Sequence, residues 1–152
     1  MPQARPNTVE THLPSELESY QAILGLRAQT LQGVMDQALR GLDFKAAERL
    51  RRHLDVSLTE LADIIQMAPR TMHRRRQSGR LHPDESDRVL RASRLYGQAL
   101  ELFEGNEETA RQWLAKPQRA LGGRIPLEVA KTDIGARQVE NLIGRLEHGV
   151  FT

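Results

Sequence analysis

Apolar residues recur along most of the chain at intervals of three and four positions, the spacing that gathers them on one face of an α-helix. No stretch shows the strict alternation of a half-buried strand, so the pattern predicts an all-α protein. Capping residues bound the expected helices: Ser57 or Thr59 can begin the stretch SLTELADIIQM, and Pro69 suits the first turn of the next helix. The expected helices cover residues 13–25, 27–39, 44–54, 58–67, 69–78, 83–103, 107–114 and 134–147, with a single turn at Pro126.

Residues 58–78 carry the spacing of a helix-turn-helix, in which two short helices are joined by a tight turn. The second helix crosses the first closely and needs a small residue there, which Ala62 supplies. Four residues later, Gln66 occupies a turn position often held by glycine. Met72, ten residues after Ala62, is placed to enter the core from the second helix. The sequence therefore predicts a helix-turn-helix, with an unrelated helical hairpin as the alternative.

The second of these helices is basic, and its arginines point in different directions. With Met72 inward, positions i, i+3, i+4 and i+7 form one outward stripe, which consists of Arg70, His73, Arg74 and Gln77. Arginine and glutamine match the hydrogen-bonding edges of guanine and adenine in the major groove. Thr71 can offer a phosphate contact near the helix start, whereas Arg75 and Arg76 leave the stripe and contact the DNA backbone or have no function. The predicted DNA-binding residues are Arg70, Thr71, His73, Arg74, Arg75, Arg76 and Gln77.

The distribution of charge adds to this picture more than its total does. A net charge of +2 is too small to indicate a nucleic-acid partner by itself. Residues 70–94, however, contain eight arginines and three acidic residues, whereas residues 100–113 contain four glutamates and one arginine. This asymmetry suggests two surfaces with different partners.

Composition excludes several classes of protein. The 152 residues suffice for one domain or two small helical units, and the absence of cysteine excludes a disulfide framework, a zinc knuckle and thiol catalysis. The five histidines are scattered without metal-ligand spacing, so we expect no catalytic residue, metal, cofactor or small-molecule substrate. No apolar run is long enough to span a bilayer, and the N-terminus lacks the features of a secretory signal. We therefore expect a cytoplasmic protein without a membrane partner, with residues 1–14 as a disordered arm.

Two stretches of the chain, within residues 30–152, resemble a known family. LTELADIIQMAPRTMHRRRQSGRLHPDESDRVLRASRLYGQALELF is similar to the Cro-type helix-turn-helix of Xre-like antitoxins. EETARQWLAKPQRALGGRIPLEVAKTDIGARQVENLIGRLEHGVF resembles the C-terminal toxin-binding domain of the Xre/MbcA/ParS group. Gln66 at the turn and Ala68 at the usual serine cap depart from the family pattern. The residues that carry the second resemblance are Ala110, Trp113, Leu114, Leu121–Gly123, Pro126–Glu128, Gly135, Ala136, Val139, Gly144, Arg145, Gly149 and Val150.

The resemblance implies a Cro-like helical DNA-binding domain over residues 15–82 and a small helical toxin-binding domain over residues 83–152. It implies a type II toxin–antitoxin system whose toxin is a RES-domain enzyme that destroys NAD. The antitoxin would block that enzyme and, as a homodimer on double-stranded operator DNA, repress its own operon. The residues expected to contact the toxin are Arg137, Glu140, Arg145, Glu147, His148, Gly149, Val150 and Phe151.

Two other functions remain open on the sequence. A stand-alone helix-turn-helix transcription factor with a C-terminal sensor or dimerisation domain would contain a buried pocket lined by a few polar groups. An adaptor without DNA binding predicts that replacing Arg70 and Arg74 by alanine leaves operator affinity unchanged.

Overall fold

The computed structural model describes residues 16–149, and all regular structure in that part of the chain is helical. The all-α prediction is therefore confirmed. The α-helices are α1 (Glu16–Leu24), α2 (Leu31–Arg40), α3 (Phe44–Leu54), α4 (Leu58–Ile64), α5 (Pro69–Ser78), α6 (Pro83–Leu102), α7 (Glu107–Ala115), α8 (Pro126–Val129) and α9 (Asp133–Glu147). A short 3₁₀ turn, Arg119–Leu121, lies between α7 and α8. None of the helices in residues 16–149 is long and apolar enough to cross a membrane.

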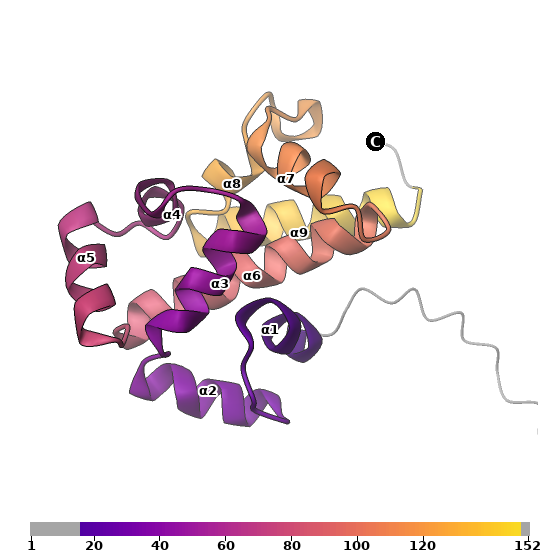
Figure 1. Cartoon of the computed structure of the whole chain (residues 1–152). Helices are drawn as coiled ribbons and strands as arrows, with labels where there is room; N and C mark the ends of the chain where they lie inside the picture. The colour runs from indigo at the N-terminus through magenta and orange to yellow at the C-terminus, as the bar shows by residue number, and fades with distance from the viewer. Residues whose placement is uncertain (1–15, 150–152) are drawn as a thin grey trace, which may run out of the picture.

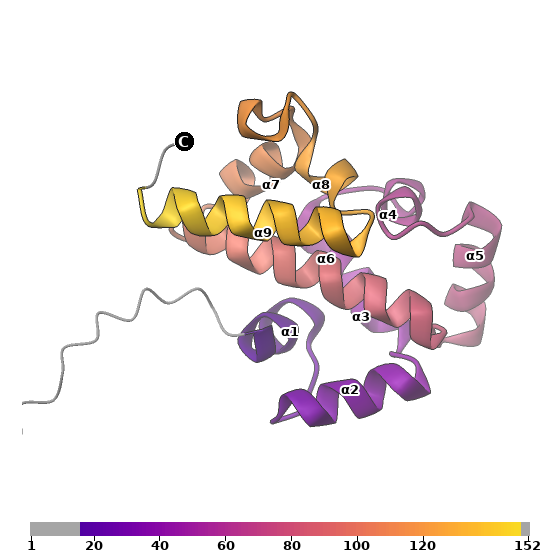
Figure 2. The ribbon, with the colours of Figure 1, turned by 180° about the vertical axis from the view of Figure 1, so that it is seen from behind.

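The long helix α6 organises the molecule. It packs against α1, α2 and α3 on one side and against α7 and α9 on the other (Figures 1 and 2). Its buried residues accordingly occupy more than one face and include Val89, Leu95, Tyr96 and Ala99. The sequence assigned residues 83–152 to the C-terminal domain, but α6 belongs by its contacts to both halves.

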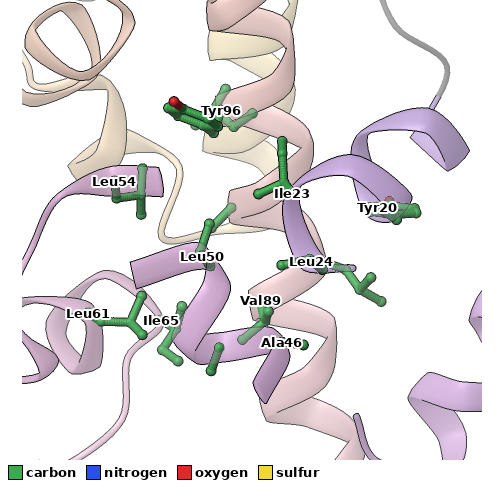
Figure 3. Close-up of a cluster of buried hydrophobic side chains, with 14 of the residues drawn as sticks. Tyr20, Ile23, Leu24, Ala46, Leu50, Leu54, Leu61, Ile65, Val89 and Tyr96 are labelled. Atoms are coloured by element: carbon green, nitrogen blue, oxygen red, sulfur yellow. The ribbon is translucent and has the colours of Figure 1, made fainter. Parts of the chain in front are cut away.

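One continuous core joins the two halves. Leu50 of α3 and Val89 of α6 are fully buried among side chains from α1 and α4, as Figure 3 shows. The same cluster extends to Val139 and Ile143 on α9. Burial of each such side chain contributes roughly 1.5–3 kcal/mol. Because the cluster is continuous, residues 107–149 are stabilised by the same core as residues 58–78.

Local capping explains most of the helix boundaries. The Asp43 carboxylate accepts from the Lys45 N–H at 2.9 Å at the start of α3, and Ser57 and Glu60 form a reciprocal capping box on α4. The second helix starts at Leu31 rather than near Arg27, as the sequence had suggested. The Thr30 hydroxyl accepts from the Gly33 N–H at 3.0 Å, and no comparable cap exists at Arg27. The expected arm over residues 1–14 and the start of the first helix lie outside the described residues.

Candidate nucleic-acid interface and partner-binding surface

The α4–turn–α5 segment has the geometry that the spacing predicted. Ala62 and Met72 are each 1% exposed, so the close helix crossing and the inward methionine are confirmed. Gln66 has a φ of 54°, the left-handed conformation for which glycine is usual at this turn. The Met67 N–H donates to the Ala62 carbonyl at 2.7 Å and closes the turn. The tight turn thus forms without glycine.

Contacts with the C-terminal half hold this turn in place. The Gln66 side-chain amide donates to the Lys131 carbonyl at 2.9 Å, and the Lys131 ammonium lies 3.3 Å from the Asp63 carboxylate. From α6, the Arg88 guanidinium donates to the carbonyls of Ile65 and Gln66 at 3.0 and 2.9 Å. The side chain that replaces glycine therefore links the helix-turn-helix to the connection between α8 and α9.

The outward stripe of α5 is free of protein contacts that would neutralise it. Arg70, His73, Arg74 and Gln77 are exposed, and within residues 16–149 neither Arg70 nor Arg74 has an ion-pair partner. The Arg74 guanidinium donates only to the half-buried Thr71 hydroxyl, at 3.3 Å. Ala68 provides no side-chain cap, so the N-terminus of α5 stays available to a phosphate group. This face presents the donors that a DNA duplex would meet.

Arg75 has a different position from the one its sequence suggested. Its Nε donates to Glu85 Oε1 at 2.7 Å, and its side chain is only 16% exposed. Burial opposes ionisation of Glu85, but the hydrogen bonds from Arg75 and from the His82 N–H outweigh it and lower the pKa of Glu85. Arg75 therefore fastens α5 to the start of α6, and its predicted contact with the DNA backbone stays a prediction.

Arg76 is more exposed than Arg75 and only loosely paired. Its Nε lies 3.9 Å from a Glu48 carboxylate oxygen on α3, and more than half of its side chain is exposed. The guanidinium therefore stays accessible to a phosphate.

The C-terminal half is built from α7, α8 and α9 around α6. Ala110 and Leu114 are fully buried on α7, and the rings of Trp113 and Phe103 lie 6.3 Å apart at the edge of the core. Gly135 lies in the first turn of α9, against the Val129 carbonyl, where a Cβ atom would have no room. These residues, several of which carried the family resemblance, fix the frame of this half.

The predicted toxin contacts are scattered over α9. Arg137 is exposed and pairs with Asp133 on its own helix. Arg145, His148 and Gly149 are exposed near the helix end, whereas Glu147 is half-buried. Val150 and Phe151 lie outside the described residues.

Glu140, which the resemblance named as a toxin contact, is instead engaged within the protein. Its carboxylate accepts from Arg94 Nε of α6 at 2.6 Å, with both side chains 20% exposed. Burial opposes the charge of Arg94, but the hydrogen bonds to Glu140 and to the Tyr20 hydroxyl outweigh it and raise the pKa of Arg94. Glu140 thus joins α9 to α6, because its position on the helix turns it toward the core.

Of a group of four exposed cations in the C-terminal half, sequence reasoning singled out only Arg145. Within residues 16–149 its members have no ion-pair partner, and all are exposed: Lys116, Arg119, Arg124 and Arg145. We call them the C-terminal basic patch. Arg124 and Arg145 line an open cleft of about 330 Å³. The signal was present in the sequence, because residues 109–127 contain no acidic residue.

The structure offers little support for a sensor or a metal site. Four hollows of about 330 to 490 Å³ in the described part of the chain are open surface clefts rather than enclosed pockets. In the part of the chain that the structure describes, no group of three metal-ligating side chains comes together.

Comparison with known proteins identifies two domains along the chain. Residues 33–94 match the antitoxin Xre-like helix-turn-helix domain, and residues 98–149 match the antitoxin Xre/MbcA/ParS C-terminal toxin-binding domain. The join between the two matches falls inside α6, consistent with the contacts of that helix on both sides.

Curated relatives extend the likeness to most of the chain. Antitoxin Xre of Yersinia enterocolitica is 33% identical over 130 residues, which cover 85% of this chain and 88% of the relative. Antitoxin Xre of Photorhabdus laumondii is 42% identical over 74 residues, 49% of this chain and 50% of the relative. Prs ADP-ribosylating antitoxin of a Sphingobium strain is 26% identical over 128 residues, 78% of this chain and 79% of the relative. This chain therefore belongs to the Xre antitoxin family, and it combines a DNA-binding helix-turn-helix with a toxin-binding domain, neither of which is an enzyme.

Proposed function

We propose that this antitoxin neutralises a RES-domain toxin that degrades NAD and that, as a homodimer, it represses its own operon. The observation that carries the proposal is the outward stripe of α5, unpaired and exposed in a helix-turn-helix that shares one core with a toxin-binding domain. The name of the Sphingobium relative supports a second candidate for the toxin, an ADP-ribosylating enzyme. Both kinds of enzyme consume NAD. They differ in whether the ADP-ribose group is transferred to a protein.

The C-terminal basic patch is our candidate for the main toxin contact, together with the exposed end of α9. Its four cations are not neutralised by the protein within residues 16–149, so they remain available to an acidic toxin surface. Arg137, Arg145, Glu147, His148, Gly149, Val150 and Phe151 remain part of this proposal. Glu140 is expected to act through the fold, because Arg94 already holds its carboxylate.

The toxin-binding role is best tested without truncation. Removing residues 134–152 would also remove Val139 and Ile143 from the core, so loss of protection would not distinguish binding from folding. We expect the charge reversal Arg124→Glu/Arg145→Glu to abolish rescue of cells that express the toxin encoded beside this gene. The matched control Arg70→Glu/Arg74→Glu should lose operator binding and still rescue growth.

Two readouts keep this experiment decisive. A RES toxin should deplete cellular NAD without labelling protein, whereas an ADP-ribosylating toxin should transfer label from NAD to a protein target. Full rescue by Arg124→Glu/Arg145→Glu, with unchanged affinity of the purified complex, would contradict the basic patch as the toxin contact.

The exposed face of α2 supports a homodimer. Leu31, Met35 and Leu39 are 46%, 62% and 72% exposed and lie four residues apart on one face. A two-fold axis through Met35 would place Leu31 of one copy against Leu39 of the other, so the row is complementary to itself. A single helix-turn-helix buries little DNA surface, and specific binding normally requires two half-sites. In Figure 1, α2 lies along a different edge of the molecule from α5, so pairing through α2 leaves both copies of α5 free.

The dimer surface has a direct test. Met35→Asp should convert the protein from a dimer to a monomer in light scattering, and it should weaken binding to paired half-sites far more than to one half-site. Asp36→Asn, on the adjacent position, is the matched control. A dimer of unchanged stability in Met35→Asp would exclude this surface.

A further inference from the structure

A second basic surface lies beside the helix-turn-helix, where the loop after α1, the end of α2 and the start of α3 meet. It is a cleft of about 490 Å³, and we call it the cationic cleft. Five basic side chains line it: Arg27, Arg40, Lys45, Arg49 and Arg80. Neither the toxin-binding domain nor the outward stripe of α5 contributes to it.

The charges of the cationic cleft are not balanced by the protein. Arg27, Arg40, Lys45 and Arg49 have no ion-pair partner among residues 16–149. Asp43 is the acidic residue of the lining, and its carboxylate is used to cap α3 through the Lys45 N–H. Side chains of like charge gathered around one cleft repel each other, and a bound anion would relieve that repulsion.

The cleft is also held in shape by the backbone around it. The Arg49 guanidinium lies directly over Gly25, which has a φ of 69° and no side chain to displace it. The Arg80 guanidinium donates to the Gly41 carbonyl at 2.8 Å, and Gly41 in turn packs against the Leu81 carbonyl with no room for a Cβ atom. Two of the cationic groups are therefore positioned before any ligand arrives, which lowers the entropy cost of binding.

The cationic cleft is anchored to the end of α5. The Phe44 N–H donates to the Gly79 carbonyl at 2.9 Å, and the Leu81 N–H donates to the Leu42 carbonyl at the same distance. Arg80 stands two residues after the last residue of α5, and its side chain lines the cleft. The cationic cleft is therefore attached to the C-terminal end of the helix that carries the outward stripe.

Guanidinium groups bind phosphate through paired, charge-assisted hydrogen bonds. We propose that the cationic cleft binds phosphate groups, namely those of the DNA backbone beside the half-site that α5 contacts. This inference rests on the proposed operator binding and adds a second contact surface to it. Its contribution is independent of base sequence, because phosphates carry no sequence information directly.

The test compares two triple variants with the same loss of charge. Arg27→Gln/Arg40→Gln/Arg49→Gln removes the cleft cations, and Lys116→Gln/Arg119→Gln/Arg124→Gln removes three exposed cations of the C-terminal basic patch. Dissociation constants are measured against salt on a duplex limited to the operator half-sites and on one extended by about one helical turn (about 10 base pairs) at each end. Each lost phosphate contact should reduce the slope of log affinity against log salt by about 0.9.

For the cleft variant we expect a loss of affinity of about tenfold or more on the extended duplex, equal for operator and unrelated sequence, with a reduced salt slope. The loss of affinity should be smaller on the short duplex. The control variant, measured without the toxin, should bind both duplexes with the affinity and salt slope of the unmodified protein. An unchanged slope in the cleft variant would overturn the cleft as a DNA contact. Absence of DNA binding by the unmodified protein would instead overturn the proposed operator function.

A second arm identifies a free ligand. Tripolyphosphate is titrated into the unmodified protein and the cleft variant while the melting temperature is followed. Stabilisation of the unmodified protein alone, combined with equal DNA binding by both, would assign the cleft to a free polyphosphate and overturn the DNA assignment.

Discussion

Two successive helices, α5 and α6, are both rich in arginine, but within the described residues only α5 leaves some of its arginines, Arg70 and Arg74, without an ion-pair partner. All three arginines of α6 are ion-paired: Arg88 to Asp84 at 2.8 Å, Arg91 to Asp87 at 3.5 Å and Arg94 to Glu140 at 2.6 Å. On α5, Arg70 and Arg74 face outward with no ion-pair partner within residues 16–149. Two of the α6 pairs lie within the helix and the third, Arg94–Glu140, joins α6 to α9, whereas Arg70 and Arg74 of α5 are left for a partner.

The comparison changes what the charge of residues 70–94 means. Eight arginines in that segment suggested a broad basic surface, but five of them are engaged by carboxylates of the same chain. Those left unpaired within the described residues are Arg70, Arg74 and Arg80. A count of charges therefore overstates a binding surface wherever acidic residues lie one helical turn away or on a packed neighbour.

The largest expected effect concerns Arg94 of α6. Arg94→Ala would leave the mostly buried Glu140 carboxylate unpaired, so the free energy of unfolding should fall by about 3 kcal/mol, the low end for a buried pair because a fifth of each side chain is exposed. Urea denaturation measures this change. Arg74→Ala is the matched control and should alter stability by less than about 0.5 kcal/mol. Similar losses for the two variants would remove the distinction between α5 and α6.

The next effect concerns Arg74 of α5. Arg74→Ala should cost about 1–3 kcal/mol of operator binding, because a side chain in the outward stripe supplies paired donors to a base edge. Titrations with operator and unrelated duplexes, at one salt concentration, give the specific part. A loss of the same size on both duplexes would show that Arg74 contacts phosphate rather than a base.

A smaller effect concerns the buried ion pair between Arg75 of α5 and Glu85 of α6. The pKa of Glu85 is lowered in the folded protein, so the carboxylate stabilises the fold above its unfolded value of 4.5, and this stabilisation is lost as pH falls through the folded pKa. Glu85→Gln should lower the free energy of unfolding at pH 7 by about 1 kcal/mol, and should lose less stability than the unmodified protein below about pH 5. The exposed neighbour Asp84→Asn should leave the acid branch of the stability curve nearly unchanged. Parallel curves for Glu85→Gln and the unmodified protein would contradict this role.

The smallest effect concerns Arg76, which has a loose internal partner and remains more than half exposed. Arg76→Ala should weaken binding equally for all DNA sequences and reduce the salt slope by about 0.9, the share of one phosphate contact. A sequence-dependent loss would place Arg76 among the residues that contact bases.

Much of the helix-turn-helix follows from the sequence because its determinants are local. The Ser57–Glu60 capping box, Pro69 at a helix start and the spacing from Ala62 to Met72 lie within a few turns of each other. The start of α2 was predicted at Arg27, but Thr30, three residues later, provides the side-chain cap, so the helix begins at Leu31. Lys116, Arg119 and Arg124 of the C-terminal basic patch were missed because they belong to the connection between α7 and α8, which the sequence does not show to be a neighbour of α9.

By itself the sequence determined the helices, the inward and outward faces of α5 and the membership of a family, because these depend on residue types at fixed short spacings. Only the tertiary structure decided which cations are free. Arg75 meets Glu85 ten residues away and Arg94 meets Glu140 46 residues away, because the packing of α6 against α5 and α9 brings the charges together. An arginine forms an ion pair within the protein or is available to a partner, depending on whether a carboxylate lies within about 4 Å of its guanidinium. For side chains distant in sequence, only the packed fold determines whether such a carboxylate is present.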